Sequence, residues 1–72
     1  MMLILGEQQL EAMSVKDLVR HVRAIESEEE VKFKHSAEAL AAMTRGALVR
    51  RALEVQAEIA RQRAIANQSK VR

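Results

Sequence analysis

A long apolar stripe in the second half of the chain is the strongest constraint on its fold. Between Ala37 and Ala66, apolar residues recur at intervals of 3, 4 or 7 positions. This heptad-like spacing places them on one face of an α-helix. The stripe consists of Ala37, Ala41, Leu48, Ala52, Val55, Ile59 and Ala66. We therefore predict a long amphipathic helix over about residues 37–66, followed by a frayed tail over residues 66–72.

A second, shorter stripe lies in the first half. Val15, Leu18, Val22 and Ile25 follow one another at intervals of 3, 4 and 3 positions, which predicts a helix over about residues 14–26. Residues 7–13 fit a short preceding turn of helix. Residues 27–36 lose the pattern without any Gly or Pro. Within them, residues 31–34 fit a short strand or a continued helix, and we favour a connection because one unbroken helix would expose its whole stripe.

The two halves also share a sequence pattern. The residues LEAMS at 10–14 and LVR at 18–20 return as LAAMT at 40–44 and LVR at 48–50, at a constant offset of 30 residues. Ser14 and Thr44 have side-chain oxygens that suit the N-cap of a helix. A duplication explains this echo, and so do two independently capped amphipathic helices.

Length and composition then indicate how these helices are covered. The chain has 72 residues, 49% of them apolar, no Cys and no Pro. A single domain of this size has a thin core and no disulfide to support it. We therefore predict an all-α fold over residues 1–72: an antiparallel two-helix hairpin with a short N-terminal element, which dimerises into a four-helix arrangement. The predicted oligomer or partner interface comprises Leu18, Val22, Ile25, Leu48, Ala52, Val55 and Ile59.

Charge is nearly balanced, with a formal net charge of +2. Lys16, Arg20 and Arg23 stand at i, i+4 and i+7, which places three cations on one helix face beside the apolar stripe. These three residues, together with Lys32 and Lys34, are the predicted contacts for nucleic acid or an acidic partner. The face of the second helix opposite its stripe is expected to be solvated and self-paired, through Arg50, Arg51, Glu54, Glu58 and Arg61. Arg45 and Arg63 are expected close to the apolar side of the second helix, where each either snorkels at the rim of an interface or pairs with a carboxylate across it.

No combination of residues indicates catalysis. The two histidines, His21 and His35, lie on different elements, and His21 is expected to be solvated. Glu28, Glu29 and Glu30 are adjacent, so on a helix they point in different directions and do not form a metal loop. We find no phosphate-binding Gly loop and no nucleophile elbow. The sequence predicts no enzyme activity, no cofactor, no metal and no small-molecule substrate.

The apolar start, residues 1–5, ends at Gly6-Glu7. It is too short for the core of a signal peptide or for a spanning helix, so we read it as a short strand or packing arm. We therefore expect a cytoplasmic protein without a membrane segment.

Part of the chain resembles a ribbon–helix–helix DNA-binding domain. Residues 31–34 (VKFK) are similar to the strand of that family, and residues 44–53 (TRGALVRRAL) are similar to its second helix. Between them, residues 36–43 supply about two turns for its first helix. Over residues 31–59, the resemblance implies a dimer in which Lys32 and Lys34 face the major groove.

Taken together, these observations predict a small non-enzymatic regulator or adaptor. It would self-associate and bind a partner protein through its amphipathic helix faces. The alternative is a dimeric nucleic-acid-binding regulator that uses the basic stripe or the short basic ribbon.

Overall fold

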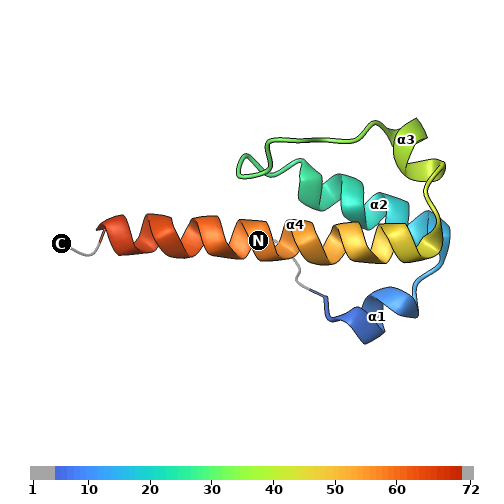
Figure 1. The fold of residues 1–72 in the computed structure, drawn as a ribbon, viewed down its shortest axis with the longest axis horizontal. Helices are drawn as coiled ribbons and strands as arrows, with labels where there is room; N and C mark the ends of the chain where they lie inside the picture. Colours follow the sequence, from blue (N-terminus) through green and yellow to red (C-terminus); the bar gives the residue numbers. More distant parts are fainter. Residues whose placement is uncertain (1–4, 71–72) are drawn as a thin grey trace.

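Four helices follow one another in the part of the chain that the computed structural model describes, residues 5–70, with side chains for residues 5–66 (Figure 1). They are α1 (Glu7–Glu11), α2 (Val15–Glu26), α3 (Ala37–Ala41) and α4 (Arg45–Lys70). The described residues contain no β-strand, so the all-α prediction is confirmed.

Side-chain caps define where α2, α3 and α4 begin. The Ser14 hydroxyl accepts a hydrogen bond from the Asp17 N–H at 3.2 Å, and the Thr44 hydroxyl accepts one from the Ala47 N–H at 3.2 Å. Ser36 caps α3 in the same way, accepting from the Ala39 N–H at 3.1 Å. Each cap satisfies a backbone donor that the first turn of a helix leaves without a partner.

The 30-residue echo corresponds to a structural repeat. In both copies a five-residue helix is followed by a three-residue turn and a longer helix, and each element of the second copy begins 30 residues after its counterpart. The short helix of each copy packs on the long helix of the other copy: α1 packs on α4, and α3 packs on α2. Exchanging the two copies therefore reproduces these contacts, as in an arrangement with approximate two-fold symmetry.

The long helices run in the same direction, so the predicted antiparallel hairpin is wrong. The beginnings of α2 and α4 lie at the same end of the molecule (Figure 1). Contacts confirm this order, because Arg45 lies against the Met13 carbonyl near the start of α2 whereas Arg63 lies against Glu28 just after its end. The connection makes this possible. After turns at residues 27–30 the chain is non-helical over residues 31–36, and six extended residues span about 20 Å, enough to return along the length of α2, about 18 Å.

The hydrophobic core is built within one chain. Its buried apolar side chains are Leu10, Leu18, Val22, Ile25, Val31, Leu40, Leu48, Val49, Ala52, Val55 and Ile59. All seven residues predicted to form an oligomer or partner interface belong to this core and are 0–2% exposed. Leu10 and Leu40 from the short helices, and Val31 from the connection, help to cover the two stripes. The argument that a second subunit must cover them therefore does not hold.

Several predicted boundaries also change. The expected helix over residues 37–66 is interrupted at residues 42–44, where α3 ends and Thr44 caps α4. Helix α4 continues to Lys70, past the predicted beginning of the frayed tail, and residues 71–72 lie outside the described part. The connection at 27–36 is confirmed, as are the short helix within 7–13 and the end of α2 at Glu26. Residues 1–4 of the predicted packing arm lie outside the described residues.

We expect Ser14→Ala and Thr44→Ala each to lower the free energy of unfolding by roughly 0.5–2 kcal/mol, because each leaves a first-turn N–H without its acceptor. Urea denaturation followed by circular dichroism measures this loss. Glu54→Ala, at an exposed position in the middle of α4, is the control and should change stability by less than about 0.5 kcal/mol. A neutral Thr44→Ala would contradict the restart of the helix at Arg45.

Candidate functional site

Two polar side chains are buried at equivalent positions of the repeat. Glu26, the last residue of α2, is 2% exposed, and Gln56, the residue 30 positions later on α4, is 5% exposed. A buried polar group is costly unless it is hydrogen-bonded, so the contacts of these two residues decide how the halves fit together.

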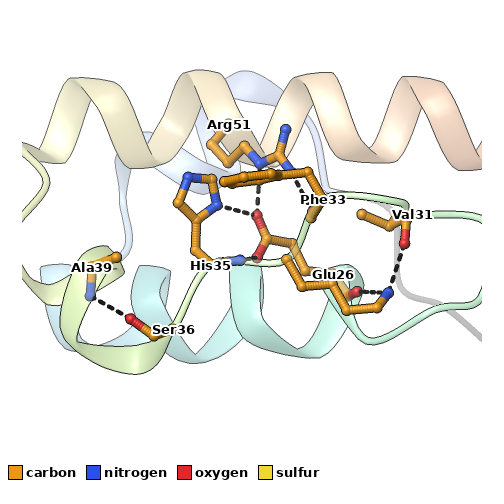
Figure 2. A network of polar contacts seen from close by, with 8 residues as sticks. Glu26, Val31, Phe33, His35, Ser36, Ala39 and Arg51 are labelled. Atoms are coloured by element: carbon orange, nitrogen blue, oxygen red, sulfur yellow. Dashed lines mark hydrogen bonds and ion pairs between the residues drawn. The ribbon is translucent and has the colours of Figure 1, made fainter.

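Glu26 accepts three hydrogen bonds from the second copy (Figure 2). Its Oε1 accepts from the backbone N–H of His35 at 2.7 Å. Its Oε2 accepts from Nδ1 of His35 at 2.8 Å and from Nε of Arg51 at 2.6 Å. The Nδ1 position of His35 therefore carries the proton. One carboxylate thus joins the end of α2 to the extended segment and to α4.

These contacts determine the ionisation of Glu26. Burial of the carboxylate raises its pKa, but the hydrogen bonds from Arg51 and His35 and the positive charge of Arg51 outweigh burial. The net effect is a pKa below the ordinary value of 4.5. Glu26 is therefore an anion at neutral pH, held by cationic and neutral donors.

Gln56 makes the corresponding contacts with the first copy. Its Oε1 accepts from the backbone N–H of Leu5 at 3.2 Å and from Nε2 of His21 at 2.9 Å. Its amide nitrogen donates to the Leu5 carbonyl at 2.8 Å. Leu5 and His21 are the 30-residue counterparts of His35 and Arg51, so each copy anchors the other by the same pair of positions. His21 is half-buried in this contact, which corrects the prediction of a solvated histidine.

An exposed aromatic ring lies against His35 and Arg51, the two residues whose side chains bond Glu26. Phe33, the sole aromatic residue of the chain, is 64% exposed. Its ring meets the edge of the His35 ring at a centroid distance of 4.7 Å, and the Arg51 guanidinium lies 5.9 Å from its centroid. Arg51 also donates from Nη2 to the Phe33 carbonyl at 2.9 Å. Ring and backbone of Phe33 are therefore both fixed by residues that Glu26 orients, as Figure 2 shows.

A groove of about 550 Å³ lies beside this ring, between the extended segment and α4. Val31 and Val55, both buried, contribute apolar surface to it, and charged residues surround them. We call Phe33 together with this groove the Phe33 surface. The groove is lined by Val31, Lys32, Phe33, Arg51, Glu54, Val55, Ala57, Glu58 and Arg61.

The predicted basic contacts lie at different places. Lys16, Arg20 and Arg23 are all exposed on α2, and Lys32 is exposed beside the groove. Lys34 has a structural role instead, because its Nζ donates to the carbonyls of Glu26, Glu28 and Val31 at 2.6–3.0 Å. It thereby satisfies carbonyl groups at the end of α2 and in the turns that follow.

The other charged residues follow the predictions in part. Arg63 pairs with Glu28 and Glu30 of the same chain at 2.9 Å each, so the acidic run is engaged rather than simply solvated. Arg45 instead donates to the backbone carbonyls of Glu11 and Met13. Arg61 pairs with Glu58 on the outer face of α4, as expected. Arg51 differs. It pairs with Glu26 across the fold rather than with Glu54 on its own helix.

Glu26, Gln56 and Phe33 did not emerge from the sequence as site residues. The 30-residue offset carried one usable signal, since it aligns Glu26 with Gln56 on the apolar sides of the two helices. The exposure of Phe33 had no such signal, because it depends on the direction in which residues 31–36 return.

In comparisons with protein-family models, with curated proteins and with solved structures, nothing matches this chain. The resemblance to a ribbon–helix–helix domain therefore stays a prediction. Within the described residues, no helix is both long enough and apolar enough to cross a membrane. The same residues contain no group of three or more His, Asp or Glu side chains placed to hold a metal ion.

We expect Glu26 to make the protein sensitive to acid. Its pKa is lower in the folded chain than the ordinary 4.5, so its contribution to stability is complete above that pH and is lost as the pH falls through the folded pKa. Glu26→Gln should lower the free energy of unfolding by about 1–3 kcal/mol at pH 7. The difference between wild type and variant should shrink below about pH 4.5. Denaturation series from pH 3 to pH 7 test this, and a difference that does not depend on pH would contradict it.

We expect that Glu at position 26 and Gln at position 56, the two buried polar side chains, are not interchangeable. Gln56→Glu removes the N–H that bonds the Leu5 carbonyl and sets a carboxylate oxygen against it. This should lower the free energy of unfolding by about 1–3 kcal/mol at pH 7. Gln8→Glu, at an exposed position of α1, is the matched control and should change stability by less than about 0.5 kcal/mol. Equal stability of Gln56→Glu and wild type would refute the assigned contact.

Proposed function

We propose that the chain is a small non-enzymatic adaptor that binds a partner protein at the Phe33 surface. The observation that carries this proposal is a large apolar side chain that stays 64% exposed while neighbouring side chains hold it in place. The helix faces first predicted to bind a partner form the core, so binding needs a different surface.

The features of the Phe33 surface suit protein recognition. Aromatic and arginine side chains carry much of the binding energy in protein interfaces, and here Phe33 and Arg51 lie in contact. Fixing a side chain before binding reduces the entropy lost on association. Charged residues such as Lys32 and Glu54 at the edge of the groove would form the polar rim that surrounds an apolar contact. The partner we expect is a protein segment that places an apolar side chain against Phe33.

Self-association and a cytoplasmic location remain part of the proposal. The core does not require a second subunit, so a homodimer would form through an exposed surface. Sedimentation velocity of the wild type and of Phe33→Ala tests this. A dimer that Phe33→Ala converts into a monomer would make a second copy the occupant of the Phe33 surface.

The proposal is tested by affinity purification of the tagged protein from its native cells, with nuclease added. We expect Phe33→Ala to weaken capture of the partner at least about tenfold, a loss of about 1.4 kcal/mol. Val15→Ala is the matched control, because Val15 is another exposed apolar residue, 40% exposed, on a different helix. Equal capture by wild type and Phe33→Ala, with both variants folded by circular dichroism, would refute a Phe33-centred contact.

A further inference from the structure

The predicted basic stripe on α2 forms an exposed face that the rest of the fold does not use. Lys16, Arg20 and Arg23, which we call the basic face, are all exposed, and none forms an ion pair or side-chain hydrogen bond with another described residue. Arg51 and Arg63, by contrast, pair with glutamates from other parts of the chain. Three neighbouring cations without carboxylate partners repel one another and contribute nothing to folding through ion pairs.

The repeat supplies an internal comparison for this face. The counterparts of Lys16, Arg20 and Arg23 on α4 are Gly46, Arg50 and Leu53, respectively. Only the middle position keeps its positive charge. The same local structure therefore forms without the other two cations, so the fold does not require them. Their presence on α2 calls for an explanation outside folding.

The spacing of the basic face suits a regular row of negative charges. Seven residues of α-helix separate Lys16 from Arg23, an axial distance of about 10.5 Å. One strand of duplex DNA carries a charge about every 3.4 Å along its axis, so this distance spans about three intervals between phosphates. Acidic side chains on a folded partner have no such fixed period. The acidic residues of α2 itself are Asp17 and Glu26, and neither pairs with the basic face.

We infer that the basic face of α2 binds the phosphate backbone of duplex nucleic acid. The contact is electrostatic and independent of base sequence, because it uses phosphates and no base edge. It does not depend on the Phe33 surface, which lies against α4, so Phe33→Ala should leave it unchanged. A chain that carries both surfaces could hold a partner protein on nucleic acid.

Fluorescence anisotropy with a labelled 20-base-pair DNA duplex tests the inference on the full chain. Three phosphate contacts predict a slope of about −2.7 for the logarithm of affinity against the logarithm of salt concentration. Affinity should then fall about 40-fold between 50 and 200 mM salt. Replacing Lys16, Arg20 and Arg23 together by Gln should weaken binding at least about tenfold at 50 mM salt and remove most of the slope.

The matched control replaces Arg50 by Glu and Arg61 by Gln, both at exposed positions of α4, which changes the net charge from +2 to −1, as the first triple change does. It should keep most of the affinity and the slope. Equal losses in these two charge-matched variants would refute the inference, because binding would then follow net charge alone. No binding by the wild type at 50 mM salt, or equally tight binding to polyglutamate, would also overturn it, the latter in favour of an acidic protein partner.

Discussion

Each half of this chain is held by the other through one buried polar side chain. Glu26 and Gln56 are removed from water, and among the described residues every hydrogen-bond donor to their side-chain oxygens belongs to the opposite copy of the repeat. A buried acceptor without its donors costs about 1–3 kcal/mol, more if it is charged. Neither copy can avoid this cost alone. Because each copy supplies the hydrogen-bond donors for the buried side chain of the other, simultaneous folding of both copies is favoured over any state in which only one is formed.

The hydrogen bonds of Glu26 to the second copy also explain the parallel arrangement of the long helices and the position of Phe33. Glu26 needs the backbone N–H of His35, so the chain must return beside α2 before α3 begins. Returning brings Phe33 next to α4, where Arg51 contacts both Glu26 and the Phe33 carbonyl. The anchor that holds the copies together thus also orients the aromatic surface. Structure and proposed binding depend on the same carboxylate.

Local patterns predicted what is local in this fold. The caps at Ser14 and Thr44 and the loss of helix after Glu26 follow from a few neighbouring residues, and all were found. The predicted stripe of α2 was found in part, since Leu18, Val22 and Ile25 are buried whereas Val15 is 40% exposed. Helix direction could not be predicted, because a ten-residue connection permits either a tight reversal or an extended return. An apolar stripe likewise does not indicate which element of the fold covers it. The stripe on α4, predicted to need a second subunit, is covered within the chain by α2 and α1.

The repeat separates the positions that serve the fold from those that do not. Leu10 and Leu18 recur as Leu40 and Leu48, and all four are fully buried, so these leucines are explained by packing. The anchor differs between copies as Glu or Gln because the residue beside it differs: His35 offers a ring N–H to a carboxylate, while Leu5 offers only its backbone, whose carbonyl needs the amide donor. Exposed differences such as those of the basic face have no such partner in the fold. In a chain with two copies of one unit, it is these differences that packing leaves free to serve binding.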